Sequence, residues 1–285
     1  MTRRNAISRT LLASSAILPI GAHGAQEKPL KGRIRQGVTR GVFRRQGNPM
    51  SLDEMCRIAA DLGVVAFDLI GPKDFPTLKK YGLTPSMVPG GSGIKKGIND
   101  ASLHSEIEPR IRQAIRDAAA AGAPNVIVMA GDREGIPDDQ GLATAATFLR
   151  KVVGQAADAG ITLCMELLNS KVNHPGYMCD KTAWGVELCK AVGSPRFKLL
   201  YDVYHMQIME GDIIRTIRDN IAYIGHFHTA GNPGRHEFDE TQELNYRPIM
   251  QAIVDLGFDG FVAHEYTPLK DPVASLKESL RICDV

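Results

Sequence analysis

The chain alternates between short apolar runs and longer amphipathic stretches from about residue 34 to its end. A short apolar run is typical of a parallel strand that is covered on both faces, and apolar residues about 3.6 positions apart are typical of a helix. Strands are predicted to start near Ile34, Val64, Leu83, Asn125, Ile161, Phe197, Ala222 and Gly260. Helices are predicted between them, over residues 51–62, 107–121, 143–159, 182–192, 246–256 and 272–282.

This alternation of strands and helices predicts an α/β fold, the (β/α)8 or TIM barrel. The competing fold is a doubly wound open sheet, which usually has a glycine-rich turn after its first strand. Gly37 and Gly41 follow the first predicted strand closely but do not form the pattern GxGxxG. We therefore predict one barrel, a catalytic domain over residues 26–285.

The first 25 residues have a different composition from the rest. Arg3 and Arg4 precede an apolar stretch over residues 11–20, and small residues follow it. The apolar part is shorter than the roughly 20 residues of a membrane-spanning helix, and the order of basic, apolar and small residues is typical of a cleaved signal peptide. We expect export to the periplasm or the outside by the twin-arginine pathway, with cleavage after Gly24 or Ala25. A disordered basic tail is the alternative.

Composition narrows the classes of partner. Hydrophobic residues make up 44% of the chain and charged residues 23%, as in ordinary globular domains. The net charge of +2 includes the arginines near the N-terminus, so the basic surface of a nucleic-acid-binding protein is not expected. The five cysteines lack CxxC spacing, which argues against a zinc site. We expect them to be unpaired, although Cys179 and Cys189 are a conceivable pair. The number of subunits stays open, a homo-oligomer included.

Polar side chains follow four successive predicted strands at the point where each strand ends. They are Glu166, Asp202, His228 and Glu265. Because catalytic groups of TIM barrels lie at the carboxyl ends of the strands, we expect these four to converge. Each alone is also consistent with a satisfied buried polar group, but burying all four together without a cation is costly. Three carboxylates and one imidazole favour a divalent ion such as Mg²⁺ or Mn²⁺.

Five stretches in the second half of the chain carry a family resemblance. They read ELLN (166–169), YDVYHMQIMEGD (201–212), IGHFHTAGNPGRHE (224–237), ELNY (243–246) and GFDGFVAHEYTP (257–268). Together and in this order they resemble hydroxypyruvate isomerases, which belong to the xylose isomerase-like barrels, a group that also includes ketose 3-epimerases. The resemblance thins before Val64.

The resemblance implies a metal site and a reaction. In this group the four strand-end residues bind one divalent metal and the two glutamates act as acid and base, which assigns these roles to Glu166, Asp202, His228 and Glu265. The implied reaction converts hydroxypyruvate into tartronate semialdehyde by way of an enediolate, without a redox cofactor. One departure is His228, because hydroxypyruvate isomerases commonly have glutamine there and the 3-epimerases have histidine.

Two further residues are predicted to bind the substrate. His205 follows Asp202 closely and is expected to hold a substrate oxygen on the metal, the alternative being a loop histidine that caps the next helix. Arg235 lies in a loop and is expected to bind a substrate carboxylate through its planar guanidinium, the alternative being a solvated arginine. His226 is either a support for the metal ligand or a packed core residue. Asp68 either enters the pocket or bonds to a neighbouring helix.

Three functions are therefore compared. The first is a hydroxypyruvate isomerase-type enzyme with a small hydroxy-carbonyl substrate. The second is an epimerase or isomerase of a free sugar or keto-sugar, which the expected export and His228 both favour. The third is a barrel that binds a metal and a sugar without turning anything over. A metal-dependent nuclease is disfavoured by the near-neutral charge.

Overall fold

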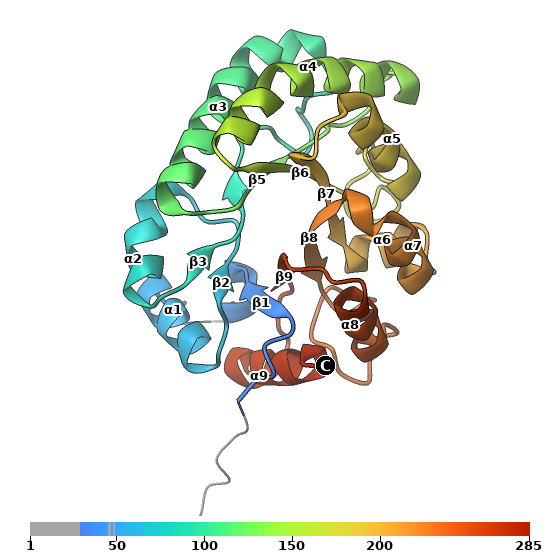
Figure 1. Cartoon of the computed structure of the whole chain (residues 1–285). Helices are drawn as coiled ribbons and strands as arrows, with labels where there is room; N and C mark the ends of the chain where they lie inside the picture. Colours follow the sequence, from blue (N-terminus) through green and yellow to red (C-terminus); the bar gives the residue numbers. More distant parts are fainter. Residues whose placement is uncertain (1–28, 45–46, 48) are drawn as a thin grey trace, which may run out of the picture.

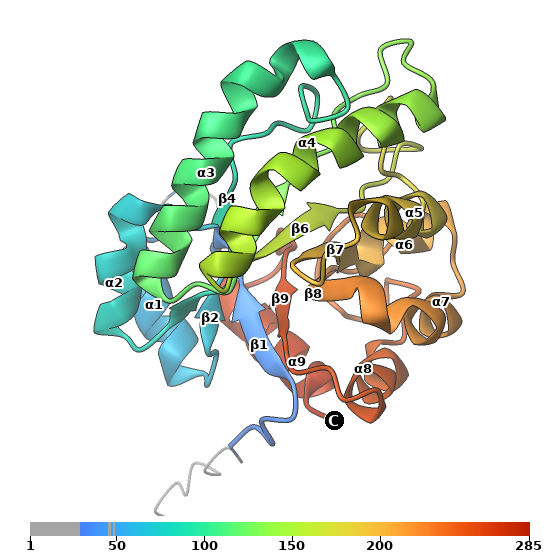
Figure 2. The same ribbon diagram turned by 45° about the horizontal axis from the view of Figure 1, so that its top comes forward.

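The computed structural model describes residues 29–44, 47 and 49–285, so the predicted signal peptide lies outside the described residues. Among the residues that it describes, nine parallel strands form one sheet in the order β3-β2-β1-β9-β8-β7-β6-β5-β4. The sheet curves into a nearly closed barrel with helices around its outside (Figure 1, Figure 2). The predicted fold class, an α/β TIM barrel, is confirmed.

The strands are β1 (Arg35–Val38), β2 (Ala66–Phe67), β3 (Thr84–Pro85), β4 (Val88–Pro89), β5 (Asn125–Val128), β6 (Thr162–Glu166), β7 (Phe197–Asp202), β8 (Ile224–Thr229) and β9 (Phe261–His264). The α-helices are α1 (Leu52–Asp61), α2 (Phe75–Lys80), α3 (His104–Ala121), α4 (Asp138–Asp158), α5 (Thr182–Val192), α6 (Val203–Met209), α7 (Ile213–Asn220), α8 (Tyr246–Asp255) and α9 (Pro272–Cys283). Short 3-10 helices are η1 (Arg40–Phe43), η2 (Pro72–Asp74), η3 (Ala101–Leu103) and η4 (Ile221–Tyr223).

The third predicted strand differs from the expectation, because it is split into β3 and β4. β3 pairs with β2 on one side, and β4 pairs with β5 on the other. Each of the two short strands ends in a proline, Pro85 or Pro89. Proline has no backbone N–H to donate to a neighbouring strand, so it limits the length of the pairing. This one stretch of chain therefore links the two edges of the sheet.

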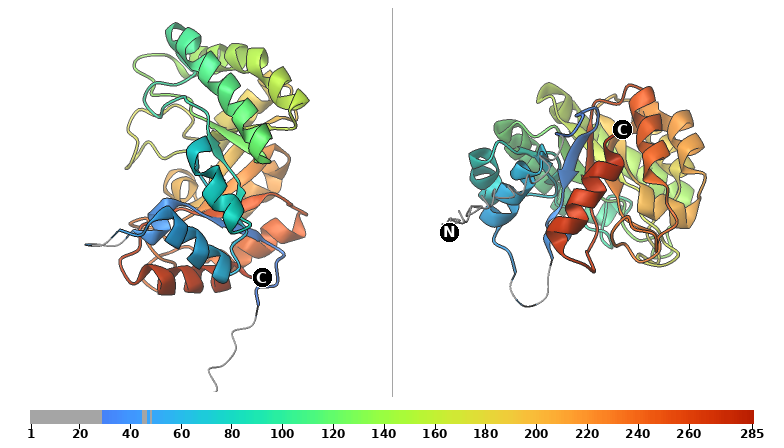
Figure 3. Two further views of the ribbon diagram at one scale, coloured as in Figure 1. Left: turned by 90° about the vertical axis from the view of Figure 1, so that its left-hand side faces the viewer. Right: turned by 90° about the horizontal axis from the view of Figure 1, so that it is seen from below.

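The helix boundaries follow the sequence in most places. The side chain of Ser51 caps α1 by accepting a hydrogen bond from the backbone N of Glu54 at 3.2 Å. α4 begins at Asp138, earlier than predicted, and the short helices α2, α6 and α7 were not predicted. The first and last strands, β1 and β9, pair, so the two ends of the described chain lie side by side (Figure 3).

The interior of the barrel has an apolar layer below the site described next. Leu200 and Asp202 lie two residues apart on β7, and Cys164 and Glu166 lie two apart on β6, so each pair points to the same face. Leu200 and Cys164 are buried together with Ile127 and Met87. All five cysteines lie in the described part of the chain and are buried free thiols. No helix in this part has the length and apolar character needed to cross a membrane.

Candidate metal centre and active site

The four predicted ligands converge at the carboxyl ends of neighbouring strands. Glu166 ends β6, Asp202 ends β7, His228 lies near the end of β8 and Glu265 directly follows β9. One possible ligand atom from each lies within 4.8 Å of those of the other three. This is close enough for all four to bind one ion, and the set of three carboxylates and one imidazole suits Mg²⁺ or Mn²⁺.

His228 lies between the two glutamates. Its Nδ1 is 3.2 Å from Oε1 of Glu166 and 2.9 Å from Oε2 of Glu265. The side chains of His228 and Glu166 are buried, whereas that of Glu265 is 22% exposed. Of the two glutamates, Glu265 is therefore the more accessible to solvent.

Arg235 reaches into the same group of charges. Its Nη2 donates to Oε2 of Glu265 at 2.7 Å and lies 3.4 Å from Oδ2 of Asp202. The backbone of Arg235 has a φ of 60°, in the left-handed region that non-glycine residues rarely adopt. The loop is held tightly, because a Cβ added at Gly231 would lie 2.3 Å from the carbonyl oxygen of Glu237. Arg235 thus contacts two of the four predicted ligands, and its role toward a substrate carboxylate stays a prediction.

His205 is fixed in one tautomer. Its Nδ1 accepts hydrogen bonds from the backbone N of Asn169 at 3.1 Å and from Nδ2 of Asn169 at 2.6 Å, which leaves the proton on Nε2. That Nε2 is buried, has no hydrogen-bond partner among the described residues and lies 3.6 Å from Oδ2 of Asp202. Burial, followed by the charge of Arg235, lowers the pKa of His205 well below its ordinary value. A neutral ring therefore keeps an unused donor beside the four ligands.

The alternative role of His205 as a cap is wrong. His205 lies inside α6, and the cap of that helix is Asp202, whose Oδ1 accepts a hydrogen bond from the backbone N of His205 at 3.2 Å. Asp202 is thus held by its helix, as a strand-end aspartate at a helix N-cap generally is. Its other oxygen, Oδ2, faces Arg235 and His205 and is the one available to bind an ion.

The three carboxyl groups of the site differ in how well their negative charge is compensated. Burial raises the pKa of Glu166 and that of Asp202, because nearby carboxylates and a dry surrounding disfavour their ionised forms. Against burial, the charges of His228 and Arg235 lower the pKa of Glu265 to about 2. A divalent cation would relieve this imbalance, so the chemistry of the donor set fits the predicted metal.

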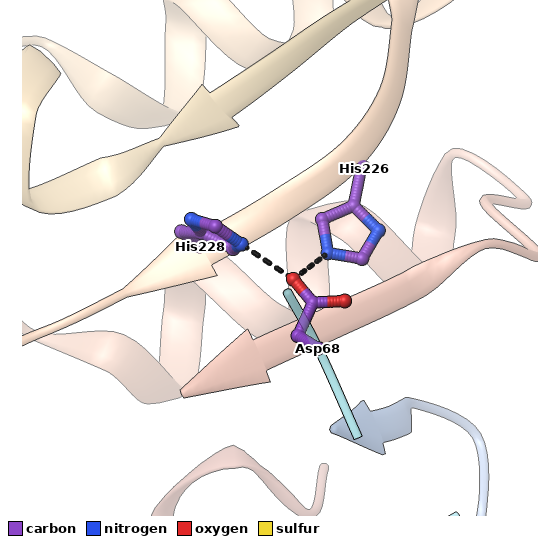
Figure 4. Close-up of side chains that lie close together, drawn as sticks. All are labelled: Asp68, His226 and His228. Carbon is purple, nitrogen blue, oxygen red and sulfur yellow. Dashed lines mark hydrogen bonds and ion pairs between the residues drawn. The ribbon is translucent and has the colours of Figure 1, made fainter. Parts of the chain in front are cut away.

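Asp68 and His226 lie together with His228 (Figure 4), and Asp68 contacts Nε2, on the side of the ring away from the two glutamates, here called the lower side. Oδ2 of Asp68 lies 2.7 Å from Nε2 of His228 and 3.1 Å from Nε2 of His226, and Oδ1 accepts a hydrogen bond from the hydroxyl of Ser86. Of the two alternatives for Asp68, the structure shows the first, because Asp68 is among the residues that line the small cavity beside Arg235 and Glu265. His226 contacts Asp68, and through Asp68 it is linked to His228. The position of Asp68 at the end of β2 is the signal that pointed to it.

A small cavity adjoins the site. It has a volume of about 290 Å³, and its lining includes Thr39, Arg40, Arg235 and Glu265. The hydroxyl of Thr39 is buried and has no hydrogen-bond partner within the described part of the chain. A larger cavity of about 760 Å³ is lined by residues of α2 and α3 on the outside of the barrel. The small cavity is the one beside the predicted chemistry.

Comparison with known proteins identifies the family of the chain. Residues 76–284 match the family model described as xylose isomerase-like TIM barrel. The chain is 37% identical over 170 residues to a 2-oxo-tetronate isomerase of Cupriavidus necator, which covers 58% of this chain and 64% of that protein. It is 33% identical over 172 residues to a putative hydroxypyruvate isomerase of Homo sapiens, covering 58% and 62%. The matched part thus spans less than two thirds of these relatives.

Solved structures show the same fold. The AP endonuclease, family 2, of Brucella melitensis superposes with a TM-score of 0.78 at 28% identity, covering 85% of this chain and 96% of that one. An L-ribulose 3-epimerase superposes with a TM-score of 0.72 at 20% identity, covering 87% and 92%. The second likeness concerns the fold alone. The family model, the relatives and the fold agree that the chain belongs to the xylose isomerase-like TIM barrel family.

Proposed function

We propose that the protein is a divalent-metal-dependent isomerase of the hydroxypyruvate isomerase type. The observation that carries the proposal is the convergence of Glu166, Asp202, His228 and Glu265 within 4.8 Å, with both glutamates in contact with Nδ1 of His228. The names of the relatives, which include hydroxypyruvate isomerase and 2-oxo-tetronate isomerase, support the reaction type.

The residues present can carry the proton transfers of this reaction. Conversion of hydroxypyruvate into tartronate semialdehyde moves one proton from C3 to C2 and one from the oxygen on C3 to the oxygen on C2, so no electron acceptor is consumed. A cation held by the four ligands would supply positive charge at the substrate oxygens. Glu166 and Glu265 take and return the carbon-bound protons, in an order that we leave open.

Other residues orient the substrate. The unused Nε2–H of His205 is a donor for a substrate oxygen, and its buried position keeps it from bonding to water instead. Arg235 and Arg40, the second of which is also paired with Asp74, line the cavity of about 290 Å³ and would favour a substrate carboxylate there. This positive charge favours an acid over an uncharged sugar.

A second candidate is an epimerase or isomerase of a free sugar or keto-sugar. The observation that favours it is His228, whose imidazole lies among the ligands as the resemblance to the 3-epimerases implies. A barrel that binds metal and sugar without turnover is the third. Export by the twin-arginine pathway is a separate proposal that depends only on the sequence of residues 1–25.

An assay with matched substrates tests the proposal. The purified protein is stripped with EDTA, reloaded with Mn²⁺ or Mg²⁺ and incubated with hydroxypyruvate, 2-oxo-tetronate, L-ribulose and D-fructose, with products resolved by chromatography. We expect metal-dependent turnover of a keto acid. Epimerised ketose without turnover of either acid would replace the first function by the second. Metal binding without any product would favour the third.

A further inference from the structure

We propose that Asp68 is a positioning residue that holds the imidazole of His228 so that Nδ1 faces the metal. This inference rests on the proposed metal site and deepens it. Asp68 follows β2 and His228 lies on β8, and β1 and β9 lie between these two strands in the sheet. The contact between them therefore crosses the barrel interior, and it is not a consequence of strand pairing.

The two nitrogens of His228 face different partners. Nε2 is 2.7 Å from Oδ2 of Asp68, whereas Nδ1 is 3.2 Å from Glu166 and 2.9 Å from Glu265. A carboxylate can only accept, so the bond to Asp68 keeps a proton on Nε2. Among the described residues Nδ1 also faces only carboxylates, so without an ion it donates to them, and a cation bound there would take the place of that proton on the Nδ1 lone pair. A histidine that binds a metal commonly donates its other N–H to a carboxylate, which fixes the tautomer and the ring orientation.

Asp68 is itself held in place from three directions. Its Oδ2 is 3.1 Å from Nε2 of His226, and its Oδ1 accepts from the hydroxyl of Ser86. The rings of His226 and His228 meet edge to face, with centroids 5.3 Å apart and planes at 83°. The side chains of Asp68, His226 and His228 are all fully buried. The carboxylate therefore has no freedom to follow a rotating ring, and the ring has little room to rotate.

A second ion between Asp68, His226 and His228 is the competing interpretation, because their polar atoms also lie close together. Two ligand atoms that are each about 2.0–2.2 Å from a tetrahedral ion are separated by about 3.3–3.6 Å. The distance of 2.7 Å between Nε2 of His228 and Oδ2 of Asp68 is instead that of a charge-assisted hydrogen bond. The geometry points to an acceptor role for Asp68.

The test compares Mn²⁺ binding by the EDTA-stripped protein and its variants, using titration calorimetry. We expect Asp68→Asn to raise the Mn²⁺ dissociation constant about 10- to 100-fold, because an amide no longer holds Nε2–H as firmly. The control is Asp180→Asn, which also removes a buried carboxylate, one bonded to Arg133 and Ser170. Its Mn²⁺ affinity should equal that of the wild type.

A double-mutant cycle separates positioning from a general loss of structure. In a His228→Gln background there is no imidazole to hold, so adding Asp68→Asn should leave the Mn²⁺ dissociation constant unchanged within about twofold. An undiminished effect of Asp68→Asn in that background would show that Asp68 does not act through His228. If Asp68→Asn does not fold, Ser86→Ala decides, with an expected increase of about threefold in the dissociation constant.

The remaining outcomes distinguish this inference from the function on which it rests. Wild-type affinity in Asp68→Asn, or in Ser86→Ala where that variant decides, overturns the role of Asp68 and leaves the metal site intact. Two Mn²⁺ ions per wild-type chain and one per Asp68→Asn chain would make Asp68 a ligand and also overturn the role. Failure of the wild-type chain to bind Mn²⁺ overturns the metal site and this inference together.

Discussion

Asp68 and Asp202 are both fully buried aspartates in the interior of one barrel, yet their surroundings shift their pKa values in opposite directions. Hydrogen bonds and charge from His226 and His228 outweigh burial and lower the pKa of Asp68. Burial raises the pKa of Asp202, and Arg235 offsets this only in part. The carboxylate of Asp68 accepts from three donors, whereas Asp202 faces two glutamates across the site.

The difference shows which side of His228 lacks positive charge. Below the ring, a single carboxylate is satisfied by a hydroxyl and two imidazoles, so nothing further is needed. Above it, three carboxylates share one imidazole and one guanidinium, and the cost of burying them remains. The carboxylates on the upper side are therefore unfavourable to bury unless a cation binds them, and such unfavourable groups of charges are common at functional sites.

The largest expected effect is on turnover. Glu265→Gln keeps the size of the side chain and removes one of the two groups proposed to move protons. We expect the catalysed rate to fall by about 100- to 10,000-fold, the usual contribution of a general acid or base. The same assay with Glu240→Gln, which removes an exposed loop carboxylate, should show unchanged turnover. Retained activity in Glu265→Gln would remove the proposed mechanism.

A second change should move stability and metal binding in opposite directions. Asp202→Asn removes one of the three crowded charges but keeps a side chain that caps α6 well. We expect the metal-free variant to gain on the order of 1 kcal/mol in free energy of unfolding, because burial disfavours the ionised carboxylate of the wild type. The measurement is urea denaturation of EDTA-treated protein near pH 7.5.

Mn²⁺ should reverse that ranking. Metal at 100 times its dissociation constant stabilises a protein by about 2.7 kcal/mol, and we expect this gain in the wild type and little of it in Asp202→Asn. Equal stabilisation of both proteins by Mn²⁺ would mean that Asp202 does not bind the ion. A less stable metal-free variant would mean that Arg235 already compensates its charge.

Replacement of His205 should have a smaller effect, confined to turnover and not to metal binding. In His205→Asn the amide oxygen can still accept from Asn169, but the Nε2–H beside the site is lost. We expect kcat/KM to fall about 10- to 100-fold, as for loss of one preorganised donor, while the Mn²⁺ dissociation constant stays the same. Loss of Mn²⁺ affinity in this variant would place His205 among the groups that hold the metal instead of the substrate.

The sequence was informative about the upper side of His228 and much less so about the lower side. Glu166, Asp202 and His228 could be predicted because each lies at the end of a recognisable apolar run, and parallel strands end at one edge of a barrel. The contact of Asp68 with β8 depends on side chains crossing the interior, and no pattern along the chain encodes which residue they meet. The same limit applies to Arg235, whose loop conformation brings it to Glu265 and Asp202.

Local backbone properties explain why the third strand and two short helices differ from the prediction. Eight apolar runs were enough to predict a barrel, but Pro85 and Pro89 divide the third of them into two short strands. The short helices α2 and α6 were missed because each spans fewer than eight residues, too few to show a clear helical repeat. Sequence patterns thus gave the layout of the barrel, and contacts between distant segments decided the details of the site.

Asp239, a carboxylate outside the barrel interior, extends the comparison with Asp68, and its replacement is expected to have the smallest effect. Asp239 resembles Asp68 in accepting from several donors, namely Nζ of Lys270 at 2.7 Å and the backbone N and hydroxyl of Thr241 at 2.9 and 2.6 Å. These hydrogen bonds, that from Lys270 first, lower the pKa of Asp239 to about 2. As for Asp68, favourable partners outweigh burial, so the ionised form of Asp239 stabilises the folded loop.

The pH dependence of Asp239→Asn tests this. A carboxyl group whose pKa is lower in the folded than in the unfolded state stabilises the fold above its unfolded pKa, near 3.9, and loses this contribution as the pH falls toward 2. We therefore expect urea denaturation to show the variant less stable than the wild type at pH 7, by less than about 1 kcal/mol because water screens the exposed Lys270. The difference should shrink between pH 4 and pH 3. A difference that stays constant over that range would mean that the hydrogen-bonding shape of the side chain, and not its charge, holds the loop.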